Sequence, residues 1–228
     1  MTTRRIASLL VAFALTAAAC KGTGGQKPPP PPLQAGHGVL PAVVVAAEGL
    51  AEDIQADLDT SRWTAARAKL AQIQASDSAL RAAVPPTSAP TLARYEAARD
   101  SLAAQLGRRD RLAALQSANR MSRVLLAIAA DYDRTVPIEV GLLDVAGRDA
   151  VYRAEAGDWL GAAASIAELR SRYAAVRAHV AAKDAALGAR LAQQLTELDA
   201  AVTSKNAARV RAVATGLLND VDLVERTY

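Results

Sequence analysis

Apolar residues recur every three or four positions along the chain beyond residue 38, and short polar or glycine-containing segments separate the runs. Leu50, Ile54 and Leu58 form the first clear run, and the same spacing returns as far as the C-terminus. Such spacing places apolar side chains on one face of an α-helix. Because β-branched and aromatic residues do not alternate with polar ones, the pattern predicts helices and no strands.

The pattern also repeats at a fixed offset. Trp63 and Trp159 are 96 residues apart, and so are Pro41 and Pro137. Positions 62, 110, 158 and 206 each fall in a polar break, so a helical hairpin recurs about every 48 residues. We therefore predict an all-α fold of about eight antiparallel helices. They form two duplicated four-helix units, over residues 38–133 and 134–228.

Single residues predict several helix ends in the first unit. Pro85 and Pro86 end the helix that enters at Trp63, because proline lacks the N–H that the helix needs. Ser88 is the expected N-cap of the next helix, since its hydroxyl can accept a hydrogen bond from a free backbone N–H. Gly107 is expected to end that helix.

Similar signals mark the later helices. Asp110 and Asp158 each precede an apolar run, where a carboxylate caps the free N–H groups of the first turn. Gly157 ends the helix before Asp158. No proline stands at the place in the second unit that corresponds to the proline pair, but the repeat still predicts a break near Lys183 and Asp184.

Composition and charge narrow the reading further. Apolar residues make up 51% of the chain but aromatic residues only 4%, so closely spaced, alanine-rich helices with a thin aliphatic core are expected. The net charge is +4, and Arg4, Arg5, Lys21 and Lys27 account for it because no acidic residue precedes residue 38. A neutral body of mixed charge offers no patch that follows a phosphate backbone, so no nucleic-acid partner is expected.

The first 19 residues are typical of a secretory signal peptide. Arg4 and Arg5 provide the positive start, and residues 6–15 are an apolar run. Ala17, Ala18 and Ala19 then precede the one cysteine of the sequence, Cys20. A transmembrane helix over residues 6–19 is the weaker alternative, because the segment is short for a bilayer.

The sequence Ala17-Ala18-Ala19-Cys20 resembles the lipobox of bacterial lipoproteins, in which the cysteine is acylated and becomes the mature N-terminus. That family usually has leucine where Ala17 stands, and the three alanines also fit cleavage by the ordinary signal peptidase. A lone cysteine at the cleavage point favours lipidation over a disulfide. The resemblance implies a membrane anchor at Cys20. With Lys21 next, it also implies sorting to the outer membrane, facing the periplasm.

Residues 20–37 are expected to form a tether after the lipidated cysteine. The five prolines of residues 28–32 favour a polyproline II segment of roughly 15 Å, which is a stiff spacer.

Few residues of the helical body, from residue 38 onward, point to catalysis. Its one histidine, His179, has no cysteine or second histidine to join it in a zinc or haem site, and no glycine-rich phosphate loop follows a strand. No metal, cofactor or enzyme activity is therefore expected.

The segment that joins the two units holds the candidate ligand site. Glu139, Asp144 and Arg148 lie near an apolar stripe, and Arg148 is one helical turn beyond Asp144. These side chains line a polar ligand pocket in one interpretation. In the other they belong to an ordinary junction with an ion pair on its surface, worth about 0.3–0.5 kcal/mol.

The two tryptophans allow the same choice. Trp63 and Trp159 could anchor a partner, but their place beside hairpin turns favours a role in covering the bundle end.

We therefore expect a non-enzymatic, membrane-anchored lipoprotein of the cell envelope that serves as a helical scaffold or interaction module for an envelope protein. The alternative is a periplasmic small-ligand binder or carrier, with its site inside a bundle or at the junction of the two halves.

Overall fold

The computed structural model describes residues 38–228, which belong to one compact unit. The predicted signal peptide, Cys20 and the tether over residues 20–37 lie outside the described residues. Within residues 38–228 the chain is helical apart from turns, a 3₁₀ segment and one isolated bridge between Val39 and Asp133, so the predicted all-α class is confirmed. The elements are α1 (Ala42–Asp59), α2 (Trp63–Ala75), α3 (Asp77–Ala83), η1 (Pro86–Ser88), α4 (Ala89–Arg108), α5 (Arg111–Ala129), α6 (Ile138–Glu155), α7 (Trp159–Lys183), α8 (Ala185–Thr203) and α9 (Ala207–Glu225).

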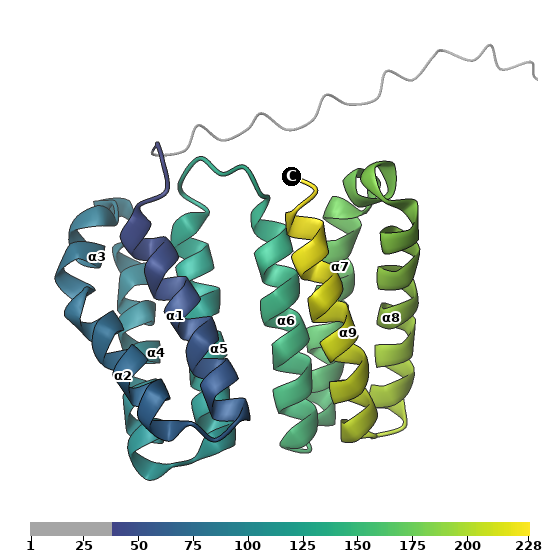
Figure 1. The fold of residues 1–228 in the computed structure, drawn as a ribbon, viewed down its shortest axis with the longest axis horizontal. Coiled ribbons are helices and arrows are strands. Elements are labelled where there is room, and N and C mark those ends of the chain that lie inside the picture. The colour runs from purple at the N-terminus through teal and green to yellow at the C-terminus, as the bar shows by residue number, and fades with distance from the viewer. Residues whose placement is uncertain (1–37) are drawn as a thin grey trace, which may run out of the picture. The chain divides into compact units, whose positions relative to one another are not determined.

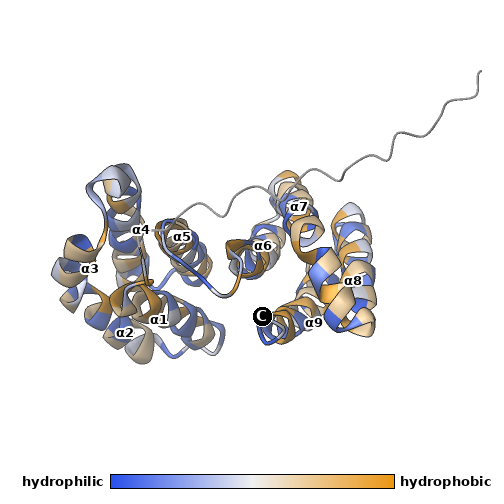
Figure 2. Ribbon diagram, turned by 90° about the horizontal axis from the view of Figure 1, so that it is seen from above, coloured by the Kyte–Doolittle hydropathy of each residue, from blue (hydrophilic) through white to orange (hydrophobic). Residues whose placement is uncertain are grey.

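The helices form two groups that lie side by side (Figure 1). In the first half, α1 packs against α2 and α5, and α4 packs against α5. In the second half, α6 packs against α7 and α9, and α8 lies between α7 and α9. Aliphatic side chains fill the interiors together with buried tyrosines, among them Tyr95 and Tyr152. Figure 2 shows both groups end-on, with α5 and α6 adjacent where the halves meet.

The helix boundaries keep the offset of 96 residues. Helix α1 begins at 42 and ends at 59, and α6 begins at 138 and ends at 155. Helix α5 begins at 111 and ends at 129, and α9 begins at 207 and ends at 225. Equivalent positions in the two halves can therefore be compared residue by residue, although the duplication itself stays a prediction.

The described residues contain nine α-helices, one more than the expected number of about eight, because the second helix is broken at Ser76. The Ser76 hydroxyl donates a hydrogen bond of 2.8 Å to the Ile73 carbonyl, which competes with continuation of the helix. Asp77 then begins α3 and accepts a hydrogen bond of 3.0 Å from the Tyr95 hydroxyl on α4.

Three predicted helix starts are confirmed at atomic level. The carboxylates of Asp110, Asp158 and Asp184 each accept a hydrogen bond from the backbone N–H three residues on, at 3.1, 2.9 and 2.9 Å. The last of these bonds accompanies the break between α7 and α8, which was expected near Lys183 and Asp184.

Two predicted helix ends are wrong in detail. Helix α4 passes through Gly107 to Arg108, and Arg109 adopts the left-handed conformation, with φ 57°, that was expected of the glycine. Ser88 precedes α4 as predicted, but its side chain does not cap the helix. Its hydroxyl instead donates a hydrogen bond to Asp131, next to the connector between the halves.

Two ion pairs stand at equivalent turns of the two halves, and the acidic and basic residues have exchanged positions between them. Arg62 contacts Asp57 at 2.8 Å beside the turn from α1 to α2. At the corresponding turn from α6 to α7, Asp158 contacts Arg153, also at 2.8 Å. Position 57 corresponds to 153 and position 62 to 158, so each half keeps the contact with the charges exchanged.

None of the helices in residues 38–228 has the length and hydropathy needed to cross a bilayer.

Candidate functional site at the junction groove

The two halves meet along two edges of different character. The closed edge is the contact of α5 with α6. The open edge is formed by α1 and α9, between which lies a groove floored by α6. Under the offset of 96 residues α1 corresponds to α6 and α5 to α9, so the open edge is the counterpart of the closed one.

The closed edge is tightly packed. Leu126 covers Gly141 so closely that a Cβ atom at Gly141 would lie 2.8 Å from a Leu126 methyl carbon. Asn119, which is 3% exposed, donates a hydrogen bond of 3.0 Å from its amide to the Val145 carbonyl on α6. The amino-acid sequence does not predict this contact, because a single polar residue in an apolar helix does not reveal its partner.

The open edge carries different residues at the same positions. Asp222 stands where the closed edge has Leu126, Glu225 where it has Ala129, and Val45 where it has Gly141. The two acidic side chains are exposed, and Val45 is 53% exposed. Because burying an unpaired carboxylate is costly and Val45 removes the room that a glycine leaves, these residues oppose the close packing that α5 and α6 show.

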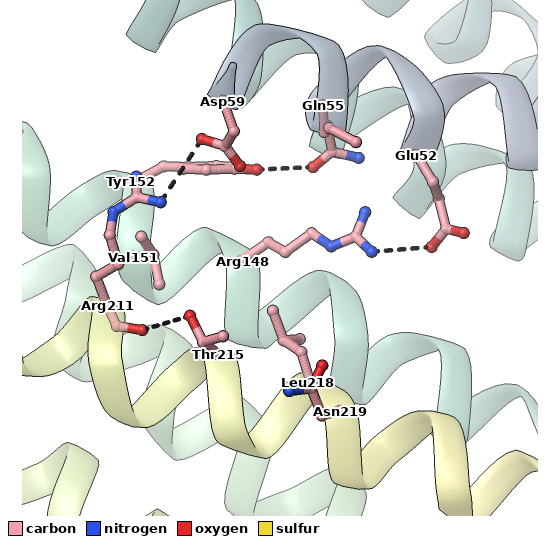
Figure 3. Close-up of a pocket in the computed structure, with 11 residues that line it drawn as sticks. Glu52, Gln55, Asp59, Arg148, Val151, Tyr152, Arg211, Thr215, Leu218 and Asn219 are labelled. Atoms are coloured by element: carbon pink, nitrogen blue, oxygen red, sulfur yellow. Dashed lines mark hydrogen bonds and ion pairs between the residues drawn. The ribbon is translucent and has the colours of Figure 1, made fainter.

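The junction groove between α1, α6 and α9 has a volume of about 260 Å³ (Figure 3). Its walls combine charged, polar and apolar side chains. They are Glu52, Gln55, Ala56 and Asp59 of α1, Arg148, Val151 and Tyr152 of α6, and Arg211, Thr215, Leu218 and Asn219 of α9.

A ring of four charges closes one end of the groove. Arg111 of α5 contacts Asp59 of α1 at 2.6 Å and Glu155 of α6 at 3.4 Å. Arg211 of α9 contacts the same two carboxylates, at 3.6 Å for Asp59 and more closely for Glu155. Each of the four junction helices thus supplies one charge, and the ring is neutral.

A hydrogen bond between the halves lies one turn further along. The Tyr152 hydroxyl on α6 donates to Gln55 Oε1 on α1 at 3.0 Å, and both side chains are buried. Burial raises the pKa of Tyr152 above its usual value, so the hydroxyl keeps its proton and remains a donor.

The predicted residues Asp144 and Arg148 come together at the next turn. Arg148 contacts Asp144 at 3.0 Å and reaches across to Glu52 of α1 at 3.3 Å. Asp144 is only 9% exposed, so the expectation of a surface ion pair is wrong, because α9 packs against α6 and Glu52 of α1 reaches Arg148 from the other side. Burial raises the pKa of Asp144 to about 7, with Arg148 opposing the rise and Glu52 adding to it.

Glu139 does not join the other two predicted residues. It lies in the first turn of α6, is half-buried and is not part of the groove wall. Its charge acts on Arg134 in the connector and on Tyr228 at the C-terminus. The ligand-binding role of Glu139, Asp144 and Arg148 stays a prediction.

Negative charge is in excess beyond the end of the groove that lies away from the neutral ring. Burial, followed by the charges of Glu52 and Asp144, raises the pKa of Glu48 to about 8. Although Glu225 is exposed, its carboxylate is partly desolvated, and this desolvation together with the charges of Glu52 and Asp222 raises its pKa as well. Sequence reasoning missed Glu48 and Glu52, although they are the equivalents of Asp144 and Arg148 under the offset of 96 residues.

A second groove of about 770 Å³ lies across α5, α6 and α7. Most of its charged side chains pair with one another, since Arg153 binds Asp149 and Asp158 at 2.7 and 2.8 Å and Arg123 binds Glu168 at 2.6 Å. The junction groove is the better candidate site, because it lies where the two halves meet and the predicted residue Arg148 lines it.

Two further expectations concern metals and the tryptophans. Residues 38–228 contain no group of three or more His, Cys, Asp or Glu side chains arranged to hold a metal ion. Trp63 and Trp159 begin α2 and α7, and both are partly buried against the hydrophobic core, in agreement with a role in covering the bundle ends.

No protein-family model, curated protein or solved structure matches this chain.

Proposed function

We propose that this chain is a non-enzymatic lipoprotein of the cell envelope, anchored through acylated Cys20, whose helical body is a rigid scaffold for an envelope protein. The observation that carries the scaffold proposal is the four-charge ring of Asp59, Arg111, Glu155 and Arg211. Because it ties α1, α5, α6 and α9 together, it holds both halves in one orientation, as a scaffold requires.

The anchor is tested by growing cells that express the full chain with an alkyne-labelled fatty acid. We expect label in the wild-type protein and its recovery with membranes, and neither in the Cys20→Ser variant. A wild-type chain that is cleaved, unlabelled and free of the membrane contradicts lipidation and supports cleavage by the ordinary signal peptidase.

The scaffold role is tested by photo-cross-linking of the full chain in its own host. We expect a discrete adduct with one envelope protein, identified by mass spectrometry.

The alternative is a small-ligand binder that uses the junction groove. In favour of this alternative, two arginines, Arg148 and Arg211, border the groove. Its volume of about 260 Å³ is, however, below the range of about 300–1,000 Å³ that encloses most small-molecule ligands. A stoichiometric small molecule found by native mass spectrometry of the purified chain, and lost from Arg148→Ala, would replace the scaffold proposal with this one.

A further inference from the structure

On the open edge, α1 and α9 are placed like the two helices of an interface, but they do not pack against each other as α5 and α6 do. On the closed edge, α6 packs against α5 through Gly141 and Leu126. On the open edge, the equivalent faces of α1 and α9 border the junction groove instead of each other. Figure 2 shows α1 and α9 apart, with α5 and α6 adjacent. The groove therefore has helical walls, and its lining spans residues 52–59 of α1 and 211–219 of α9. A partner helix would accordingly lie along the open edge, over the groove and not inside it.

The charge of this edge is unbalanced. Its carboxylates come from every helix that borders the groove, and its cations are Arg148 and the half-buried Arg134 of the connector. The carboxylates are Glu48 and Glu52 of α1, Asp144 of α6, and Asp222 and Glu225 of α9, with Glu139 near Arg134. In the described part of the chain, neither Glu48 nor Glu225 has a side-chain hydrogen bond or ion pair. A basic partner would supply the missing charge.

The spacing of these carboxylates matches a helical partner. Glu48 and Glu52 are one turn apart on α1, and Asp222 and Glu225 are about one turn apart on α9. Beyond them, Val151 and Leu218 add apolar side chains to the mixed wall of the groove before it reaches the neutral ring. A helix with two basic residues one turn apart, followed by an apolar residue a turn or two further on, fits this order.

We infer that the open edge docks a basic, amphipathic α-helix of a protein partner, whose lysine or arginine side chains pair with Glu48, Glu52 and Glu225. The inference rests on the proposed scaffold function and names the surface and the partner class. A free polyamine would satisfy the charge but would leave the apolar stretch of the groove uncovered.

Docking is coupled to protons. The pKa of Glu48 lies at about 8 and that of Asp144 at about 7, so part of these groups is protonated near neutral pH. A lysine beside Glu48 stabilises its charged form, so binding releases protons. Glu52, Arg148, Arg134, Asp222 and Glu225 are the other charged groups that act on this cluster.

The test uses the full chain purified in detergent and a fluorescent synthetic helix with two lysines one turn apart and leucines beyond them. Anisotropy measures the affinity, and calorimetry in buffers of different ionisation enthalpy measures the protons released. We expect saturable binding, proton release at pH 7.5, and a loss of about tenfold in affinity for the Glu48→Gln/Glu225→Gln variant. The Glu96→Gln/Glu197→Gln variant is the matched control, because it removes the same charge from α4 and α8.

Equal losses in both variants would show attraction to net charge alone and overturn the inference. No binding by the wild type, or binding without proton release, would overturn it as well. Spermidine that displaces the helix at equal concentration would identify a small-cation site instead. Photo-cross-links to an envelope protein that persist unchanged in Glu48→Gln/Glu225→Gln would uphold the proposed scaffold while rejecting this docking surface.

Discussion

The closed and open edges occupy equivalent positions in one architecture, yet one is packed and the other is a groove. On the closed edge, Leu126 covers Gly141 and Asn119 binds the Val145 carbonyl. On the open edge, Asp222 and Val45 stand in the places of Leu126 and Gly141. A few side chains at fixed positions thus decide whether two helices meet, while the helix boundaries stay the same.

The largest effect is expected from giving the closed edge the acidic residue of the open one. Leu126→Asp places a carboxylate at a position that is 5% exposed, and we expect the free energy of unfolding to fall by about 3 kcal/mol. Urea denaturation followed by circular dichroism measures the change. Leu160→Asp is the control, since Leu160 is 86% exposed, and it should change stability by less than about 0.5 kcal/mol. Equal stability of the two variants would mean that the closed edge contributes no packing.

The next effect concerns pH and the open edge. Glu48, with an ordinary pKa of 4.5, and Asp144, with one of 3.8, have folded pKa values of about 8 and about 7. The folded chain therefore binds more protons than the unfolded chain between these limits, and its stability falls as pH rises through them. We expect a loss of about 2 kcal/mol between pH 5 and pH 8.5, discounted for partial exposure. Glu48→Gln should flatten this profile, and a stability that rises over the same range would contradict the assignment.

A smaller effect is expected at the hydrogen bond between the halves. Asn119→Ala removes the amide that binds the Val145 carbonyl, and we expect a loss of about 1–2 kcal/mol. Hydrogen exchange should report the loss first at the amides of α5 and α6. Thr215→Ala changes the equivalent, exposed residue of α9 and should leave exchange at the junction unaltered.

The smallest effect is expected from the reverse exchange, made on the open edge. Asp222→Leu gives the open edge the residue of the closed one, but Val45 still blocks the close approach. Stability should change by less than about 0.5 kcal/mol, because Asp222 is exposed. NMR titration should show a lower pKa for Asp144, since the charge of Asp222 raises it. A shift of Asp144 in the opposite direction would contradict the electrostatic account.

The fold was readable from the sequence where local chemistry decides it. Apolar spacing predicts the helices, and Asp110, Asp158 and Asp184 cap them through bonds that span only three residues. Gly107 misled because a residue other than glycine can adopt the left-handed conformation at a modest cost, as Arg109 does. Ser88 misled because its hydroxyl found a partner 43 residues away.

The candidate site was readable only in part, because its partners come from distant helices. Asp144 and Arg148 are one turn apart and could be paired from the sequence. Arg111 and Glu155, by contrast, are 44 residues apart and lie on different helices. One usable signal was present: Asp59 and Glu155 are 96 residues apart, and each ends its helix with an acidic side chain.

The reversed ion pairs bear on how the chain avoids misfolding. In a body with two halves of matching helix lengths, α1 could exchange places with α6, within one chain or between two chains. In the native hairpins, Asp57 meets Arg62 and Arg153 meets Asp158. After an exchange, Asp57 would approach Asp158, and Arg153 would approach Arg62. Both contacts would then join like charges, so the reversed ion pairs penalise the swapped pairing and favour the native one.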